Sequence, residues 1–205
     1  MNFEEKRDFF EINIDDAKTV FDNYNPLHLE IGSGRGEFIY NKAMQNPDVN
    51  FFAVDVKEKR IKTIIRRLDE NIHKNVKVIK VFIDSETITK FPVDKIEKIY
   101  LLYPDPWPKK RHYRRRIIQD DFIDNLNRLL KLSGILEITT DHQNYAEWIK
   151  EHFDKRSDFE PIYKEKYLRN PQENHIITYF EEKKRAEGCI PYYFFYKKIK
   201  NLEEL

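Results

Sequence analysis

Three stretches of this 205-residue sequence combine residue types and spacings that could do chemistry. The first is EIGSGRG, which places an acidic residue, Glu30, two positions before three closely spaced glycines. Glycines at Gly32, Gly34 and Gly36 permit a tight turn and a close approach of the backbone to a ligand. Their spacing differs from the G-x-G-x-x-G of dinucleotide sites, and a carboxylate at Glu30 would repel a pyrophosphate. The stretch therefore favours a ligand with a cationic end.

Two further acidic residues follow the strands that we expect after this turn. Asp55 ends the second strand, where it is placed to accept hydrogen bonds from both hydroxyls of a ribose. The combination resembles the cofactor site of Rossmann-like methyltransferases that use S-adenosylmethionine, and Asp84, after the third strand, would lie on the adenine side. The structural alternative is a glycine turn that only packs a helix on a strand, with Asp55 as an N-cap.

The second stretch, LLYPDPWPKKRHYRRR at residues 101–116, holds a carboxylate and a flat ring beside a run of cations. Asp105 lies between two prolines after an expected buried strand, so its backbone has little conformational freedom. Trp107 has two interpretations, stacking on a nucleic-acid base or packing in the core. Six cations fall within eight residues, a density that can neutralise phosphates: Lys109, Lys110, Arg111, Arg114, Arg115 and Arg116.

The basic run also has a purely structural interpretation, the solvated start of the next helix. Cations at the N-terminal end of a helix oppose its dipole, so a cluster of them there favours an anionic partner. His112, inside the run, either touches phosphate or faces water.

The third feature is Asp141, at the end of the fifth expected strand. It is interpreted as an N-cap of the following helix, a role that does not exclude contact with a substrate. The six histidines include no H-x-x-x-H or comparable ligand pair, and Cys189 is the only cysteine. We therefore expect no metal site and no disulfide framework.

Hydrophobic patterning indicates the elements that must position these residues. Seven stretches are predicted to be strands: 27–31, 51–55, 76–83, 97–103, 135–140, 159–163 and 190–198. Helices are predicted from the glycine turn to Gln45, at 57–72, at 117–130 with a break at Ser133-Gly134, around Tyr145 and Trp148, and at 178–187. Alternating strands and helices predict an α/β fold with a mostly parallel sheet and helices on both faces. The last two strands, without such an alternation, are predicted to pair antiparallel.

Length and composition limit the number of domains that the chain can form. A chain of 205 residues with 40% hydrophobic content fits one cored domain, and we take 1–205 as a single domain with 26–198 as its catalytic core. Residues 1–25 are expected to be a lead-in or a lid, helical around 16–24. The net charge of +1 says little about partners. Because neither a signal peptide nor an apolar run of membrane-span length is recognisable, we expect a cytoplasmic protein without a membrane partner.

Taken together, the motifs identify a family resemblance. PDPWPKKRHYRRR, with EIGSGRG upstream, TTDH ending at His142 and TYFEEKKRAEG at 178–188, resembles the bacterial tRNA (guanine-N7)-methyltransferases, the TrmB family. The resemblance spans about residues 26–198, and PDPWPKKRH is far more specific than the glycine turn. It implies a class I methyltransferase fold and methyl transfer from S-adenosylmethionine to a guanine in the tRNA variable loop.

The resemblance also implies roles by motif position. Asp105 would be the catalytic residue. The cofactor would contact Glu30, Gly32, Gly34, Gly36, Asp55, Asp84 and Asp105. Substrate-binding positions would be Lys109, Asp141 and the segment from Thr178 to Glu181, although one glutamate on such a charged helix is often only solvated. RNA contacts would come from Arg111, His112, Tyr113, Arg114, Arg115 and Arg116. Two departures, Asp55 where the family often has Glu and Ser85 where it often has Ala, remove no functional group.

Two other functions are compatible with the residues. One is an enzyme of the same fold that methylates a different RNA or a small molecule. The other is a catalytically silent RNA-binding protein, against which the joint presence of Glu30, the three glycines, Asp55 and Asp105 argues. Both a monomer and a homodimer fit the sequence.

Overall fold

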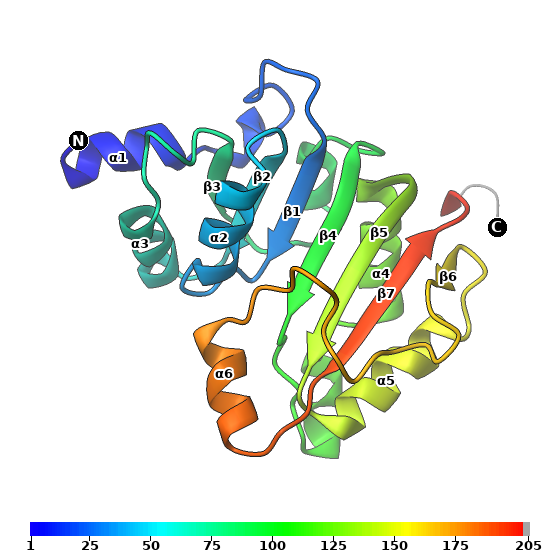
Figure 1. Cartoon of the computed structure of the whole chain (residues 1–205). Helices are drawn as coiled ribbons and strands as arrows, with labels where there is room; N and C mark the ends of the chain where they lie inside the picture. Colours follow the sequence, from blue (N-terminus) through cyan, green and yellow to red (C-terminus); the bar gives the residue numbers. More distant parts are fainter. Residues whose placement is uncertain (203–205) are drawn as a thin grey trace.

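The computed structural model describes residues 1–202, and residues 203–205 lie outside the described part. Its centre is one seven-stranded sheet with the order β3-β2-β1-β4-β5-β7-β6 (Figure 1). The strands are β1 (Leu27–Ile31), β2 (Asn50–Asp55), β3 (Val76–Lys80), β4 (Ile96–Leu102), β5 (Leu130–Thr140), β6 (Phe159–Pro161) and β7 (Tyr192–Lys198). The seven predicted strands are therefore confirmed.

Strand direction also follows the prediction. Strands β1 to β5 pair in parallel, and β7 runs antiparallel to both of its neighbours, β5 and β6. The order reverses between β1 and β4. Ligands of such sheets bind beyond the carboxyl ends of the strands at this reversal, so the loops after β1 and β4 are the first place to look for a site.

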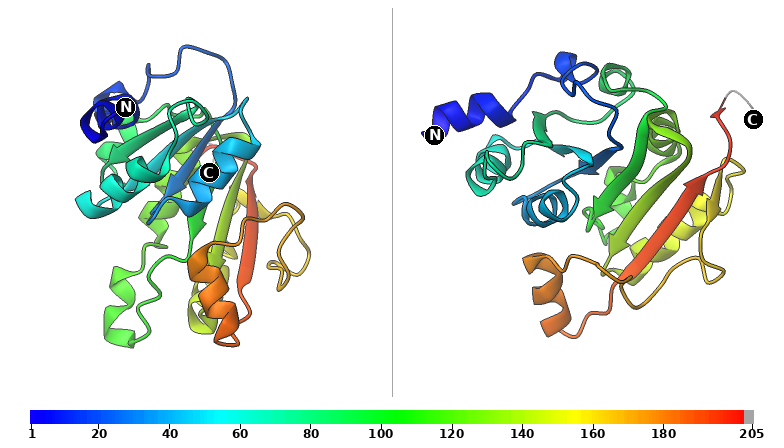
Figure 2. Two further views of the ribbon diagram at one scale, coloured as in Figure 1. Left: turned by 60° about the vertical axis from the view of Figure 1, so that its left-hand side comes forward. Right: turned by 45° about the horizontal axis from the view of Figure 1, so that its top comes forward.

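Helices cover both faces of the sheet, as the two views of Figure 2 show. On one face lie α1 (Phe3–Phe10), α2 (Glu37–Gln45) and α3 (Glu58–Arg67), and on the other lie α4 (Asp120–Leu129) and α5 (Gln143–Phe153). The last helix, α6 (Tyr179–Ala186), stands near the carboxyl ends of β4 and β5 (Figure 1). Three 3-10 helices are named among residues 1–202: η1 (Ile14–Asp16), η2 (Thr87–Lys90) and η3 (Lys110–Arg115). None of the helices in this described chain is long and apolar enough to cross a membrane.

Strand β2 shows how the sheet feeds two cores. Its residues alternate between the faces, so Phe51 and Ala53 pack under α2 and α3, whereas Phe52 and Val54 belong to the larger core beneath α4 and α5. Both faces of the strand are buried, and for that reason its sequence is a continuous apolar run rather than an alternating one.

The boundary between α4 and β5 corrects the prediction. Helix α4 begins at Asp120 and ends at Leu129, and the chain becomes extended at Leu130, which already pairs with Ile96. Ser133-Gly134 does not break the helix but lies inside β5, at a bulge with φ +66° at Ser133. A Cβ at Gly134 would come within 2.8 Å of the Lys131 carbonyl oxygen, so the bulge requires glycine.

The N-terminal segment also differs from the prediction. The helix expected around 16–24 is wrong: the α-helix is α1, which starts at a capping box made by Asn2 and Glu5. After α1 the chain runs along the edge of β3, where the Ile12 N–H donates to the Val78 carbonyl at 3.0 Å. This contact covers an edge that would otherwise present unpaired backbone groups.

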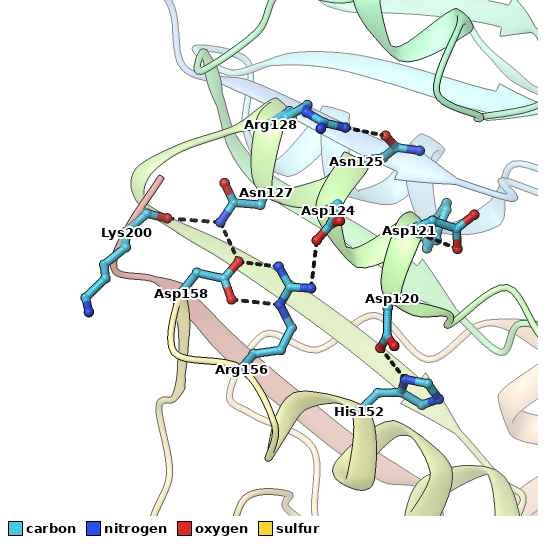
Figure 3. Close-up of polar contacts among 11 residues, drawn as sticks. Asp120, Asp121, Asp124, Asn125, Asn127, Arg128, His152, Arg156, Asp158 and Lys200 are labelled. Atoms are coloured by element: carbon cyan, nitrogen blue, oxygen red, sulfur yellow. Dashed lines mark hydrogen bonds and ion pairs between the residues drawn. The ribbon is translucent and has the colours of Figure 1, made fainter. Parts of the chain in front are cut away.

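A buried polar network ties α4 to the start of β6, at the amino end of the parallel strands (Figure 3). Asp158 is fully buried, and its carboxylate accepts hydrogen bonds from the Arg156 guanidinium at 2.7 and 2.6 Å and from Asn127 Nδ2 at 2.7 Å. Arg156 Nη1 also lies 2.8 Å from Asp124 Oδ1. The charge on Asp158 is thus fully paired, as a buried carboxylate requires.

Asp158→Asn is expected to lower the free energy of unfolding by about 1.5–3 kcal/mol. The substitution removes the charged acceptor, and the NH2 group of the new amide would face the two donors Arg156 Nη2 and Asn127 Nδ2. Urea unfolding followed by circular dichroism measures the effect. The matched control is Asp22→Asn, at an exposed position. Equal stabilities of the two variants would contradict the assigned role of the network.

Candidate active site

The turn after β1 has left-handed backbone at all three glycines. The φ angle is +81° at Gly32, +55° at Gly34 and +73° at Gly36. The Gly32 N–H donates to the Val54 carbonyl at 2.8 Å, which ties the turn to β2. A Cβ at Gly36 would lie 3.1–3.2 Å from atoms of Ile64 on α3. Both the backbone conformation and the packing of α3 therefore require glycine here.

Asp55 at the end of β2 holds this turn in place. Its Oδ2 accepts a hydrogen bond from the Gly34 N–H at 3.1 Å, and its Oδ1 accepts one from the Lys57 N–H at 2.9 Å. Each carboxylate oxygen can accept a second hydrogen bond. The side chain is half-buried, so part of the carboxylate stays accessible to a ligand.

Glu30, on β1 just before the same turn, is a buried carboxyl group with an unpaired oxygen. It is 3% exposed, and its Oε2 has no hydrogen-bond partner. Burial, opposed by Ser33 and reinforced by the charge of Asp55, raises the pKa of Glu30 to about 8. An ammonium group of a ligand would supply both the missing donor and a counter-charge. The carboxylates around the glycine turn therefore fit the cationic ligand end expected from the sequence.

The raised pKa of Glu30 predicts a pH dependence of stability. Between the ordinary pKa of 4.5 and the folded value of about 8, the folded protein holds a proton that the unfolded chain has lost, so stability falls as pH rises through this window. Glu30→Gln stays neutral and is expected to lose less stability than the parent between about pH 5 and about pH 9. Thermal unfolding at both pH values measures this. The control is Glu147→Gln, at an exposed position; parallel pH curves for Glu30→Gln and the parent would contradict the prediction.

Asp84 caps the turn that follows β3. Its Oδ1 accepts hydrogen bonds from the backbone N–H groups of Glu86 at 3.0 Å and Thr87 at 2.8 Å, and these bonds lower the pKa of the carboxyl. Asp84 therefore stays ionised and shapes the loop at the end of β3, the side on which the adenine was expected.

The loop after β4 presents Asp105. Two non-glycine residues flank it with left-handed backbone, Tyr103 at φ +52° and Trp107 at φ +41°, a conformation that costs of order 1–3 kcal/mol each. The Tyr103 N–H donates to the Thr139 carbonyl at 2.8 Å, and Arg116 Nε donates to the Pro106 carbonyl at 2.9 Å. These contacts hold an exposed carboxylate on a rigid loop beyond the sheet.

Arg116 departs from the RNA-contact role expected of it. The side chain is 2% exposed, and its guanidinium stacks over the Tyr113 ring at 3.6 Å. Its Nη2 donates to Asn144 Oδ1 at 2.6 Å, an atom that also accepts from the Tyr113 hydroxyl at 2.7 Å. Arg116 and Tyr113 therefore anchor the Asp105 loop to α5, and a phosphate does not reach Arg116 in this conformation.

Trp107 is not packed in the core, and its ring already contacts two side chains of the protein. Its ring is half-buried, with the His112 ring edge-on at a centroid distance of 5.7 Å and the Arg115 guanidinium 5.0 Å from its centroid. The indole thus orients one histidine and one cation of the basic run.

The other cations form an exposed surface, which we call the basic rim: Lys109, Lys110, Arg111, Arg114 and Arg115. They lie on η3 and the residue before it, not at the start of α4, whose first turn instead carries Asp120 and Asp121. The interpretation of the basic run as the solvated start of the next helix is therefore wrong. The argument that these cations oppose the dipole of that helix does not apply either, because they do not lie at its N-terminus. In Figure 2 the rim segment projects beyond the carboxyl ends of the strands.

Asp141 is not the N-cap of α5, because that position belongs to His142. The Asp141 carboxylate instead lies 3.8 Å from Lys184 Nζ on α6. Thr178 is the N-cap of α6 and accepts a hydrogen bond from the Glu181 N–H at 3.3 Å. The contact between Asp141 and Lys184 brings α6 to the end of β5.

Glu181, in the first turn of α6, is buried at 1% exposure, so its interpretation as a solvated side chain is wrong. It lies within hydrogen-bond distance of three groups: His175 Nε2 at 2.7 Å, the Tyr193 hydroxyl at 2.6 Å and Arg185 Nε at 2.9 Å. Burial alone would raise the pKa of Glu181, but these partners lower it to about 2. The carboxylate is therefore ionised and fastens α6 to β7.

Helix α6 links the two halves of the site. The Tyr179 N–H donates at 2.9 Å to Oε2 of Glu37, the residue directly after the glycine turn. The centroid of the Phe180 ring lies 4.9 Å from that of Tyr103, on the Asp105 loop.

Within residues 1–202 no group of three or more histidine, cysteine, aspartate or glutamate side chains could hold a metal ion.

Sequence reasoning missed four residues that build this arrangement: Tyr103, Asn144, His175 and Tyr193. The ion pair between Glu181 and Arg185 could have been predicted, because the two residues are four positions apart on one helix. The other partners come from distant segments and leave no such signal.

Comparison with known proteins places the chain among methyltransferases. A family model described as "Putative methyltransferase" matches residues 24–191. A tRNA (guanine-N(7)-)-methyltransferase of Bacillus subtilis (strain 168) is 34% identical over 172 residues, covering 83% of this chain and 79% of the relative. The protein of the same name from Clostridium tetani (strain Massachusetts / E88) is 37% identical over 171 residues, 82% and 79% of the two chains.

Solved structures agree on the fold. The 16S rRNA methyltransferase KamB superposes with a TM-score of 0.60 at 12% identity, covering 97% of this chain and 93% of its own. An rRNA methylase from Streptococcus thermophilus gives a TM-score of 0.56 at 14% identity, with 98% of both chains covered. At such identities the likeness shows the fold alone, a Rossmann-like class I methyltransferase fold.

Proposed function

Because this chain belongs to the family of tRNA (guanine-N7)-methyltransferases, we propose that it transfers a methyl group from S-adenosylmethionine to N7 of a guanine in the variable loop of tRNA. The observation that carries the proposal is the exposed Asp105 carboxylate, held on a rigid loop at the point where the strand order reverses. The domain that does this would span residues 1–205, with 26–198 as its catalytic core.

The residues around the glycine turn fit S-adenosylmethionine, which supplies an electrophilic sulfonium methyl group when bound. The fit rests on the buried Glu30 oxygen without a partner, which matches an ammonium group. Asp55 would accept hydrogen bonds from the ribose hydroxyls, and the Asp84 loop would lie on the adenine side. Backbone at Gly32, Gly34 and Gly36 allows the close approach.

The chemistry of guanine N7 suits a site without a general base. N7 has an exposed lone pair and no proton to lose, so attack on a methyl group demands mainly correct positioning. A fixed carboxylate at Asp105 can accept hydrogen bonds from guanine N1–H and N2–H, a pair of donors that adenine lacks. Its negative charge also stabilises the cationic N7-methyl product. Asp105 would therefore select the base and hold it.

The basic rim supplies the contact with RNA. A target base must leave its stack to reach a pocket, which is easier in a variable loop than in a duplex. Cations of the rim would hold the phosphates beside the site, with Lys109, Asp141 and Thr178 nearest to the nucleotide. Lys109 precedes η3 and follows the Asp105 loop directly, so it is the cation closest to the loop along the chain.

Transfer of labelled methyl to tRNA transcripts tests the proposal. One transcript carries the variable-loop guanine and the other carries adenine there, and chemical cleavage specific for N7-methylguanine maps the product. We expect label and cleavage at that guanine and neither in the adenine transcript. Label at another atom would indicate a different acceptor. Cofactor binding without any transfer would mean that the acceptor is another molecule, whereas tRNA binding without cofactor binding would indicate a silent RNA-binding protein.

A further inference from the structure

Asn144 connects α5 to the loop that carries Asp105. Its Oδ1 accepts two hydrogen bonds, one from Arg116 Nη2 at 2.6 Å and one from the Tyr113 hydroxyl at 2.7 Å. The same guanidinium donates through Nε to the carbonyl of Pro106 at 2.9 Å, and Pro106 directly follows Asp105. Two hydrogen bonds through one side chain therefore link Asn144 to the backbone next to the Asp105 carboxylate.

The guanidinium of Arg116 has little freedom to find another acceptor. The side chain is 2% exposed, and Cζ lies 3.6 Å from the ring centroid of Tyr113, 5.1 Å from that of Tyr145 and 5.0 Å from that of Trp148. Its Nη1 is already buried without a hydrogen-bond partner. Loss of Asn144 Oδ1 would leave a second buried donor unpaired, and because such a donor costs free energy, the guanidinium would move away from its present position.

The loop needs this support because its backbone is strained. Tyr103 and Trp107, on either side of Asp105, are non-glycine residues with φ angles of +52° and +41°. Such backbone persists only where the surrounding contacts over-determine it. Before Asp105, the Tyr103 N–H donates to a carbonyl of β5 at 2.8 Å. After Asp105, the loop is held by Arg116, whose own position depends on Asn144.

On these grounds we propose that Asn144 is a positioning residue of the reaction, which fixes the Asp105 carboxylate by holding Arg116 against α5. The inference rests on the proposed function, in which Asp105 holds the target guanine, and adds to it a residue of a different element. A carboxylate that must meet two N–H groups of a base tolerates little misplacement, because an error of about 1 Å can cost roughly 100-fold in rate.

The test replaces Asn144 by leucine and by aspartate. Asn144→Leu removes the acceptor and is expected to lower the turnover number at saturating tRNA roughly 10- to 100-fold. Asn144→Asp keeps an acceptor at the same position, so its turnover number is expected to stay within about 3-fold of the parent. The dissociation constant for S-adenosylmethionine should change less than about 2-fold, because distant sites without shared partners act independently. Gln143→Leu is the matched control, since Gln143 is the exposed neighbour on the same helix.

A double-mutant cycle separates positioning from general damage to the fold. If Asn144 acts through Asp105, Asn144→Leu should change the single-turnover rate of the Asp105→Asn variant less than about 2-fold, because the carboxylate that it positions is gone. An equally large loss in both backgrounds would overturn the inference. So would parental turnover by Asn144→Leu, or failure of Asn144→Asp to restore turnover.

A second readout does not need turnover. Hydrogen exchange followed by mass spectrometry should show faster exchange of the backbone amides of residues 103–116 in Asn144→Leu than in the parent, and parental exchange in Asn144→Asp and Gln143→Leu. Equal exchange in Asn144→Leu and the parent would overturn the inference. If the parent transfers no methyl group, the proposed function fails, and faster exchange in Asn144→Leu still supports the link between α5 and the Asp105 loop.

Discussion

Asp105→Asn is expected to lower the turnover number for tRNA methylation roughly 100- to 1000-fold, a loss similar to that of one preorganised charge-stabilising group in other enzymes. The amide keeps one acceptor but turns a donor toward the N–H groups of guanine, and it removes the charge that stabilises the cationic product. The position is exposed, so the fold should be unaffected.

Single-turnover kinetics with saturating tRNA and cofactor measures this effect. Asp48→Asn is the matched control, because Asp48 is also exposed and also follows a proline but precedes β2 at the opposite end of the sheet. If Asp105→Asn turned over like Asp48→Asn, the carboxylate would have no part in the reaction. Asp105→Glu, which keeps the charge but shifts it by one methylene group, is expected to fall between the two.

The distribution of charge accounts for the two ligands of the proposed function, a cationic cofactor and an anionic RNA, on a nearly neutral protein. The net charge is only +1. The carboxylates of Asp55 and Asp105 lie at or beyond the carboxyl ends of β2 and β4, whereas the cations gather on η3. Opposite fields are thus kept in neighbouring regions, and whole-chain charge carries no information about either.

The features that the sequence predicted well are those set by local patterning. Strand β2 is a continuous apolar run between polar residues, and a strand buried on both faces produces that pattern whatever its neighbours are. The glycine turn was predictable because few residues other than glycine adopt left-handed backbone at several closely spaced positions. The end of α4 was not, because Leu129 and Leu130 look alike and pairing with β4 decides which of them is extended.

Side chains whose role depends on distant partners were beyond the same reasoning. Arg116 and Arg114 are equivalent in the sequence, but only Arg116 meets Asn144 and Tyr113 and is buried by them. Glu181 looks like any glutamate on a charged helix, and only the fold brings His175 and Tyr193 to it. Charge in a sequence therefore indicates a functional region, whereas tertiary contacts decide which members of the region are free.

This division of the basic run leads to the second large effect. Lys110, Arg111 and Arg114 are exposed members of the basic rim, so their joint replacement by alanine is expected to weaken tRNA binding roughly 50-fold at 0.15 M salt. The slope of log binding constant against log salt concentration should become shallower by about 2, because each phosphate that a cation neutralises contributes about 0.7 to it. Affinity for S-adenosylmethionine should not change, because the proposed cofactor site lies at the carboxyl ends of β1, β2 and β3.

Filter binding of tRNA across a salt series, with calorimetry for the cofactor, measures both quantities. The control replaces three exposed lysines elsewhere, Lys18, Lys74 and Lys95, of which the last two lie just before β3 and β4 at the amino end of the sheet. The same decrease in net charge there should leave the salt slope nearly unchanged. Arg116→Ala is expected to behave differently from both, losing turnover and thermal stability together, because it releases the Asp105 loop from α5. A rim variant that loses cofactor affinity along with tRNA affinity would show that the rim is structural, and equal salt slopes for the rim and control variants would place the RNA on another surface.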